Sequence, residues 1–151
     1  MGRKHTTPGV YTHQFVVPKS AVDGNGHANN VMFLQWMQDI AVSHYESMGG
    51  RDVTMSMGAT WVVREHHIEY LLPAFAGDGI EVQTWVTNFR RVRSLRKYQF
   101  VRQSDGQVLV RGETDWVFVD AGSFQPRRIP PEIQGLFTLL PEDFRPGKKD
   151  A

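Results

Sequence analysis

Asp23-Gly24-Asn25-Gly26-His27-Ala28-Asn29-Asn30 is the stretch that stands directly before the one long helical pattern of this 151-residue chain. Apart from the glycines and Ala28, each of its side chains forms hydrogen bonds or carries a charge. A helix N-cap preceded by turn glycines accounts for part of this composition. A carboxylate, an imidazole and three amides together also form a candidate functional site at the helix entrance.

The pattern that follows predicts one long helix over residues 31–48. Its apolar positions recur at helical spacing, namely Phe33, Trp36, Met37, Ile40, His44 and Met48. Gly49 and Gly50 are predicted to end it. Strands are predicted over residues 11–17, 60–70, 79–89, 94–102 and 108–119, and the Asp105-Gly106 pair favours a hairpin turn between the last two. A short final helix is expected at 131–137, and residues 141–151 form a polar tail.

This order predicts an α+β protein in which a five-stranded antiparallel sheet wraps one central helix. The chain is expected to form a single domain over residues 1–151, with a core at about 11–132. The strands carry apolar residues on both faces, as in the pairs Trp61/Val63 and Val62/Ile68. One helix cannot cover both faces, so we expect a homodimer or a homotetramer.

The polar stretch resembles the Asp-x-x-Gly-His-x-Asn-Asn signature of the 4-hydroxybenzoyl-CoA thioesterase branch of the hotdog-fold superfamily. It is also similar to the Asp-x-Asn-x-His-x-Asn-Asn signature of plant acyl-ACP thioesterases. Weaker similarities follow in the family's order, at residues 61–64, 68–74, 77–78, 114–120 and 127–130. The resemblance implies a hotdog fold, an active site at a dimer interface and hydrolysis of an acyl-CoA or acyl-ACP thioester.

The resemblance assigns Asp23 the role of nucleophile or general base, and the sequence does not separate these two routes. It places the backbone amide of Asn30 as a donor to the oxyanion, at a helix start that favours negative charge. His27 is a candidate to bond to the Asp23 carboxylate, to substrate or to a neighbouring loop, or is a purely structural histidine. Asn25 either holds the catalytic carboxylate or is an ordinary turn asparagine.

Two further residues near this stretch are candidate substrate contacts. Gly26 allows the chain to turn and to approach the thioester closely. Phe33 stands where the family usually has a tyrosine, so this position lacks the hydroxyl that a phenol contact to substrate would need.

A basic window without acidic residues contains Arg90, Arg91, Arg93, Arg96, Lys97 and Arg102. In a strand Arg91 and Arg93 share one face, and Arg96 lies on the opposite one. The window is either a solvated strand edge or a site for the phosphates of coenzyme A, which arginines bind well.

Composition excludes several other functions. The net charge of +1, from 17 basic and 16 acidic residues, provides no field for nucleic acid. No segment approaches the ~20 apolar residues of a membrane span, and no signal peptide is recognised, so a cytoplasmic protein is expected. With no cysteine, and with only Glu65 and His67 able to converge from one strand, we expect neither a metal nor a cofactor.

Two other functions fit the same resemblance. Hotdog enoyl-CoA hydratases carry an Asp-x-Asn-Pro-x-His motif, and this chain lacks the proline and the spacer. A non-catalytic acyl-CoA sensor would bind ligand without turnover, but a buried carboxylate beside a thioester is costly where no chemistry needs it.

Overall fold

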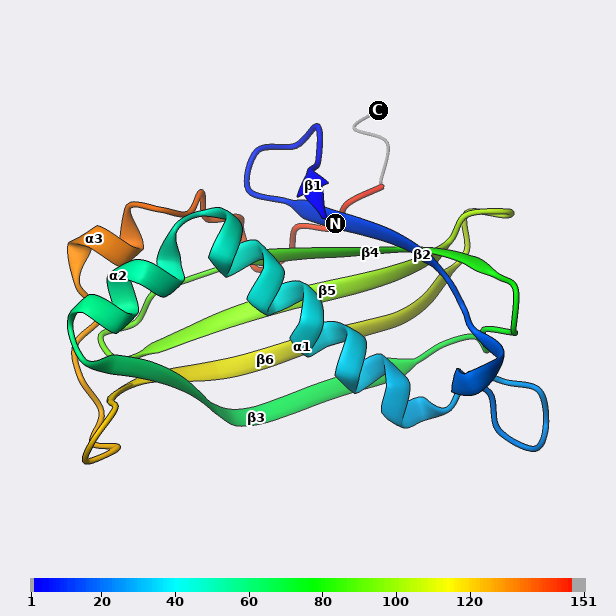
Figure 1. The fold of residues 1–151 in the computed structure, drawn as a ribbon. Helices are drawn as coiled ribbons and strands as arrows, with labels where there is room; N and C mark the ends of the chain where they lie inside the picture. The colour runs from blue at the N-terminus through cyan, green and yellow to red at the C-terminus, as the bar shows by residue number, and fades with distance from the viewer. Residues whose placement is uncertain (1, 148–151) are drawn as a thin grey trace.

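Residues 2–147 are described in a computed structural model of the chain (Figure 1). The strands are β1 (Arg3–Lys4), β2 (Tyr11–Val16), β3 (Ala59–Tyr70), β4 (Gly79–Val86), β5 (Arg93–Arg102) and β6 (Val108–Asp120). The helical segments are the 3-10 turn η1 (Lys19–Ala21), α1 (Asn30–Ser47), α2 (Gly50–Ser56) and α3 (Pro131–Gln134). The predicted order of one strand, one long helix and four strands is confirmed.

All strand pairs are antiparallel, and the order within the described residues is β1-β2-β4-β5-β6-β3. The two-residue β1 adds a short sixth strand to the five that the sequence predicts. At the other edge, β3 pairs along one side with β6 and has no strand of residues 2–147 on its other side. Figure 1 shows α1 lying across one face of the sheet, with α2 and α3 at one end and the loop between β2 and α1 at the other.

The buried face of α1 consists of Phe33, Met37, Ile40, Ala41 and His44. Met37 is fully buried, and a Cβ on Gly112 of β6 would lie 2.8 Å from its sulfur. The glycine in β6 therefore allows the helix to pack directly on the middle of the sheet.

The end of α1 differs from the prediction. Gly49 adopts a φ of +78°, as expected of a residue that ends a helix. Gly50 then begins α2 at once, and its backbone packs against the ring of Tyr45. The two glycines thus make a corner between two helices, which a pattern of stop signals alone does not indicate.

An irregularity in the β3–β6 register between Val63 and Glu65 changes which residues of β3 face the helix. Trp61 pairs with Phe118 and Ile68 pairs with Gly112, so both lie on the same face, and Ile68 packs against the main core. The expectation that Ile68 contributes apolar surface to the second face is wrong, because the extra residue reverses the alternation.

The outer face of the sheet is partly covered by the segment after Leu139. Lys97 Nζ donates to the carbonyl of Glu142 at 2.8 Å, and Gln99 Nε2 donates to that of Pro146 at 2.9 Å. The ring of Phe144 packs edge-on against Trp85, with a centroid distance of 5.5 Å. Residues 141–147, expected as a polar tail, therefore pack on the sheet; the rest of that tail lies outside the described residues.

Candidate active site

The Asp23 loop is closed by its own hydrogen bonds. Asp23 Oδ1 accepts from the N–H of Asn25 at 2.9 Å and from that of His27 at 3.3 Å. The Asp23 N–H donates to the His27 carbonyl at 2.8 Å, and the Gly26 N–H donates to the Asp23 carbonyl at 3.0 Å. These bonds fix the carboxylate in an exposed loop and use one of its two oxygens.

Gly26 has a φ of +80°, and a Cβ built on it would meet no atom within 4 Å. Space is therefore available for a side chain, but the left-handed backbone is not, because it places a Cβ too close to the following carbonyl. The loop needs glycine for its conformation, as the sequence suggests, and not for close packing within the subunit.

The start of α1 leaves a free donor next to this loop. Asn29 is the N-cap, and its Oδ1 accepts from the Val31 N–H at 3.0 Å. The Asn29 N–H donates to the Ala21 carbonyl at 2.7 Å, and Met32 donates to the Asn29 carbonyl at 2.9 Å. Within residues 2–147 no acceptor takes the Asn30 N–H. A free N–H at a helix start attracts a negative oxygen.

A pocket of about 390 Å³ lies between this helix start and the segment that follows β3. Of the residues that the sequence singles out, Asp23, His27, Asn30 and Phe33 line it, and Asn25 and Gly26 lie in the loop beside it. Its other lining residues are Ala28, Asn29, Tyr70, Leu71, Leu72, Pro73 and Ala74. The structure thus brings four of the predicted site residues to one cavity.

Tyr70 is the site residue that sequence reasoning missed. Its hydroxyl donates to the Asn30 carbonyl at 2.9 Å, which ties the end of β3 to the start of α1. Burial raises the pKa of the Tyr70 phenol, so the group stays a neutral donor at physiological pH. Forty residues separate Tyr70 from Asn30, and no local spacing signals this contact. A phenol is therefore present in the pocket although Phe33 lacks one.

His27 and Phe33, two other predicted site residues, both pack against aromatic rings. The half-buried His27 ring packs edge-on against Phe75, with a centroid distance of 5.1 Å, and forms no hydrogen bond with Asp23. Phe33 is 2% exposed and stacks edge-on with Trp36 and Phe100, both at 5.1 Å. Phe33 therefore forms an apolar floor, and His27 forms a wall whose ring nitrogens have no hydrogen-bond partner among residues 2–147.

The basic window does not gather at this pocket. Arg91 and Arg93 lie in and beside the turn between β4 and β5, at the end of the sheet away from the Asp23 loop. Arg93 forms an ion pair with Asp115 at 3.0 Å. Asp115 lies outside the basic window in sequence and is brought to it by the pairing of β5 with β6. At the Asp23 end, Arg102 pairs with Asp78 at 3.3 Å and donates to the Pro73 carbonyl at 3.0 Å. Arg102 thereby supports the pocket wall.

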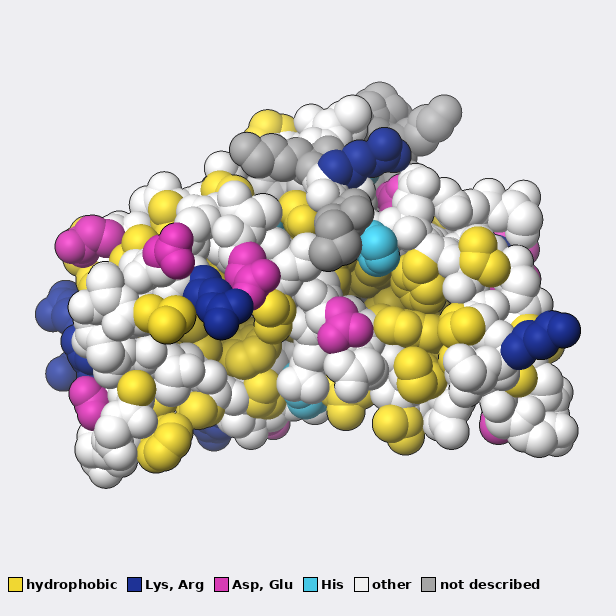
Figure 2. All heavy atoms as spheres, in the orientation of Figure 1, with side chains coloured by type: hydrophobic (Ala, Val, Ile, Leu, Met, Phe, Trp, Pro, Cys, Tyr) yellow, Lys and Arg dark blue, Asp and Glu magenta, His cyan; other side chains and the backbone are white. Residues whose placement is uncertain are grey.

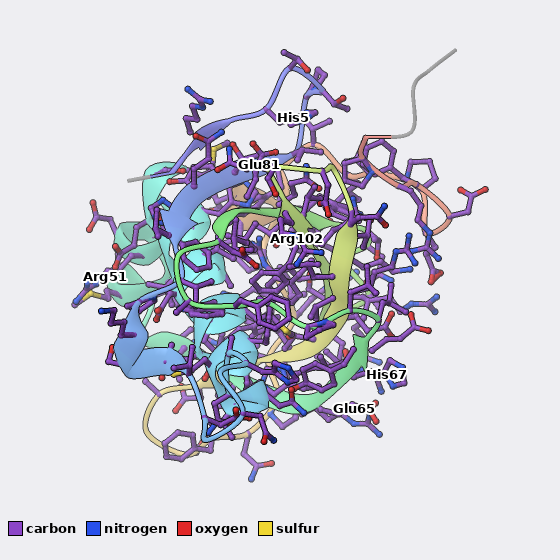
Figure 3. The ribbon with its side chains drawn as sticks, turned by 90° about the vertical axis from the view of Figure 1, so that its right-hand side faces the viewer. His5, Arg51, Glu65, His67, Glu81 and Arg102 are labelled. Atoms are coloured by element: carbon purple, nitrogen blue, oxygen red, sulfur yellow. The ribbon has the colours of Figure 1, made fainter. Side chains whose placement is uncertain are left out.

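Figure 3 shows Glu65 and His67 on the outer side of the sheet, away from α1, whereas Arg51 lies on the helix side. No group of three or more potential metal-ligating side chains occurs within residues 2–147. In the same described range, every helix is too short or too polar to cross a lipid bilayer.

The fold and the pocket define a hotdog protein with a polar site at the entrance of its central helix. The chain belongs to the thioesterase-like superfamily, whose family model matches residues 17–137. The predicted resemblance to hotdog thioesterases is therefore confirmed at the level of the family.

Individual relatives agree with this assignment. The oleoyl-acyl carrier protein thioesterase 2 of Arabidopsis thaliana is 26% identical over 138 residues, or 86% of this chain and 37% of that protein. The acyl-CoA thioester hydrolase YbgC of Escherichia coli is 29% identical over 111 residues, or 74% of this chain and 81% of that protein. The chain thus spans less than two fifths of the plant relative and most of the bacterial one.

Among solved structures, the 1,4-dihydroxy-2-naphthoyl-CoA thioesterase Slr0204 of Synechocystis superposes with a TM-score of 0.76. The two chains are 22% identical, and the match covers 85% of this chain and 95% of the other. This likeness confirms the predicted hotdog fold.

Proposed function

We propose that this chain hydrolyses acyl thioesters of coenzyme A or of acyl carrier protein, with the Asp23 pocket as its active site. The observation that carries the proposal is one cavity that combines the Asp23 carboxylate with the free N–H of Asn30. Thioester hydrolysis needs both a base or nucleophile and a donor for the developing oxyanion.

In the general-base route, Asp23 takes a proton from a water whose oxygen bonds to the thioester carbonyl carbon. The carbonyl oxygen becomes an oxyanion and accepts a hydrogen bond from Asn30 N–H. When the intermediate collapses, the carbon–sulfur bond breaks, and the thiolate takes the proton back from Asp23. In the nucleophilic route the carboxylate attacks the carbon itself, releases the thiolate and forms a mixed anhydride that water opens. Both routes leave a free acid and a thiol.

The remaining pocket residues support this chemistry by position. Tyr70 donates to the Asn30 carbonyl and so ties the end of β3 to the helix start that carries the free N–H. His27 offers ring nitrogens to substrate, and Phe33 offers an apolar surface to the acyl group. Asn25 and Gly26 maintain the loop that presents the Asp23 carboxylate.

The open edge of β3 supports a homodimer that completes this site. Unpaired strand edges favour pairing with a second strand. Two β3 strands paired antiparallel would reverse one subunit, so that Tyr70 of one lies near Ala59 of the other. The turn that carries Arg91 and Arg93 would then approach the partner's Asp23 pocket, where it meets the phosphates of coenzyme A. A tetramer would need a further interface on the outer face, which residues 141–147 partly cover.

A thiol-release assay with purified protein tests the activity. The substrates should be short, medium, long and aromatic acyl-CoAs, and one acyl-ACP. We expect stoichiometric release of thiol and acid from at least one of them. Binding without thiol release would indicate a sensor, and loss of an enoyl-CoA double bond without thiol release would indicate a hydratase. Either result would contradict the proposal.

Sedimentation velocity at assay concentrations tests the assembly. We expect a dimer, and specific activity should fall on dilution as the dimer dissociates. A fully monomeric species with undiminished activity would refute the shared site.

A further inference from the structure

A second pocket of about 390 Å³ lies at the opposite end of α1 and shares no lining residue with the Asp23 pocket. Its walls are largely apolar and aromatic, with Ala41, Tyr45, Trp61, Phe89, Trp116 and Phe137 among the lining residues. Figure 2 shows hydrophobic side chains gathered on the surface at this end of the molecule, beside α2. The cavity lies within the volume range of small-molecule sites, roughly 300–1,000 Å³.

Arg96 lines this apolar pocket and is only 5% exposed. Within residues 2–147 no carboxylate forms an ion pair with it. Five other arginines do form such pairs, namely Arg51, Arg64, Arg93, Arg102 and Arg127, with side chains 15–66% exposed. Arg96 is the one buried arginine within residues 2–147, and it has no anionic partner there.

The contacts of Arg96 do not neutralise its charge. Nη1 donates to His44 Nδ1 at 2.9 Å and to Thr84 Oγ1 at 3.1 Å. A guanidinium has only donors, so His44 Nδ1 is the acceptor in the first bond. The guanidinium carbon lies 5.9 Å from the centroid of the Phe137 ring. Nε and Nη2 have no acceptor within residues 2–147.

Such an arrangement is costly for a folded protein. Burial lowers the pKa of Arg96, with smaller opposing contributions from the nearby Tyr98 and Tyr45 oxygens. Arginine nevertheless keeps its charge at neutral pH, because its ordinary pKa is so high. Buried charges are normally paired or hydrogen-bonded throughout. An unpaired cation facing a cavity is therefore explained most simply by an anion that enters the cavity.

We propose that this pocket binds a medium-chain aliphatic carboxylate, whose head group pairs with Arg96 and whose chain lies against the apolar walls. One buried guanidinium matches one carboxylate in charge and offers the two parallel N–H donors of a bidentate pair. The other cation in the lining, Arg51, already pairs with Glu46 at 2.9 Å, so Arg96 leaves one positive charge for a ligand, which a carboxylate matches better than a phosphate group does. In the dimer proposed above, the start of β3 that lines this pocket would lie near the end of the partner's β3, so the carboxylate site would adjoin the partner's Asp23 pocket.

Calorimetric titration of the full chain with decanoate, 1-decanol and decyltrimethylammonium tests the ligand class. The three probes share a ten-carbon chain and differ in charge. We expect decanoate to bind about tenfold or more tightly than decanol, because a charge-assisted hydrogen bond contributes that much. The cationic probe should bind more weakly than either. Equal binding of decanoate and decanol would overturn the proposal.

Two variants locate the head group. Arg96→Met should lower decanoate affinity about tenfold or more and leave decanol affinity unchanged. Arg51→Met is the matched control, because Arg51 lines the same pocket but is exposed and pairs with Glu46 at 2.9 Å. It should change neither affinity. A loss of decanoate binding in Arg51→Met, or none in Arg96→Met, would contradict the assignment.

Thermal unfolding separates a binding role from a structural one. Replacing an unpaired buried charge with an apolar side chain is expected to leave the Tm unchanged or to raise it. Decanoate should raise the Tm of the wild type and not that of Arg96→Met. If Arg96→Met does not fold, Arg96→Lys keeps the charge and loses the bidentate geometry, so its decanoate affinity should be intermediate. Failure of these tests leaves the thioesterase proposal untouched, since none of them measures turnover.

Discussion

The two ends of α1 hold opposite charges in opposite environments. At the N-terminal end, Asp23 is exposed in a tight loop, and backbone N–H groups surround it. Under the C-terminal half, Arg96 is buried among aromatic side chains and faces an apolar cavity. One helix of 18 residues, about 27 Å long, thus carries a polar pocket at its start and an apolar one beside its C-terminal half.

This difference in burial and surroundings suits the two pockets to different functions. An exposed carboxylate beside a free helix N–H is suited to bond cleavage, because both the base and the oxyanion donor are within one pocket. A single cation in apolar surroundings is suited to recognition, because low polarity strengthens its pairing with an anion. Substitutions at each end test whether this division holds.

The largest effect is expected from Asp23→Asn. The amide keeps an oxygen that can accept the N–H bonds of Asn25 and His27, so the loop and the fold should persist. Loss of the base or nucleophile should lower kcat by about 100- to 10,000-fold in a thiol-release assay. Asp39→Asn, an exposed helical carboxylate bonded to Gln35, is the control and should retain activity. Near-normal turnover of Asp23→Asn would remove the N-terminal pocket from the chemistry.

Gly26→Ala should have an intermediate effect. Its φ of +80° becomes strained with a Cβ, at a cost of about 1–2 kcal/mol in the free energy of unfolding. The loop should relax and move the carboxylate, which lowers kcat by about 10- to 100-fold. Gly106→Ala has a φ of +71° and equally open space, so it should lose similar stability by thermal unfolding and keep its turnover. Parallel losses of kcat in both variants would show that strain alone is responsible.

The smallest effect is expected from Arg91→Ala combined with Arg93→Ala. The Asp115 carboxylate keeps Arg64 as a partner at 3.2 Å, so the fold should tolerate the change. KM for acyl-CoA should rise several-fold, about the contribution of one charged hydrogen bond, while KM for an N-acetylcysteamine thioester stays constant. The exposed Arg128→Ala should change neither. An equal rise in KM for both substrates would mean that the turn does not contact the nucleotide.

Much of the fold follows from local patterns in the chain. The alternation of residues 79–86 and 108–119, the helical spacing after Val31 and the Asp105-Gly106 turn each specify one element from neighbours in sequence. The Asp23 loop was also predictable, because the hydrogen bonds that close it join residues within an eight-residue stretch. These features depend on short-range geometry, which sequence spacing encodes directly.

The sequence alone determined the order of the elements, the hotdog family and the polar entrance to α1. Only the tertiary structure set Tyr70 against Asn30, brought Asp115 to Arg93, packed residues 141–147 on the sheet and moved Ile68 onto the core face. It also decided that Arg96 is the buried, unpaired member of a basic window whose residues look alike in sequence. These outcomes depend on strand register and on contacts between residues far apart in the chain. A one-residue shift in register changes the face of every side chain, and local spacing cannot fix that.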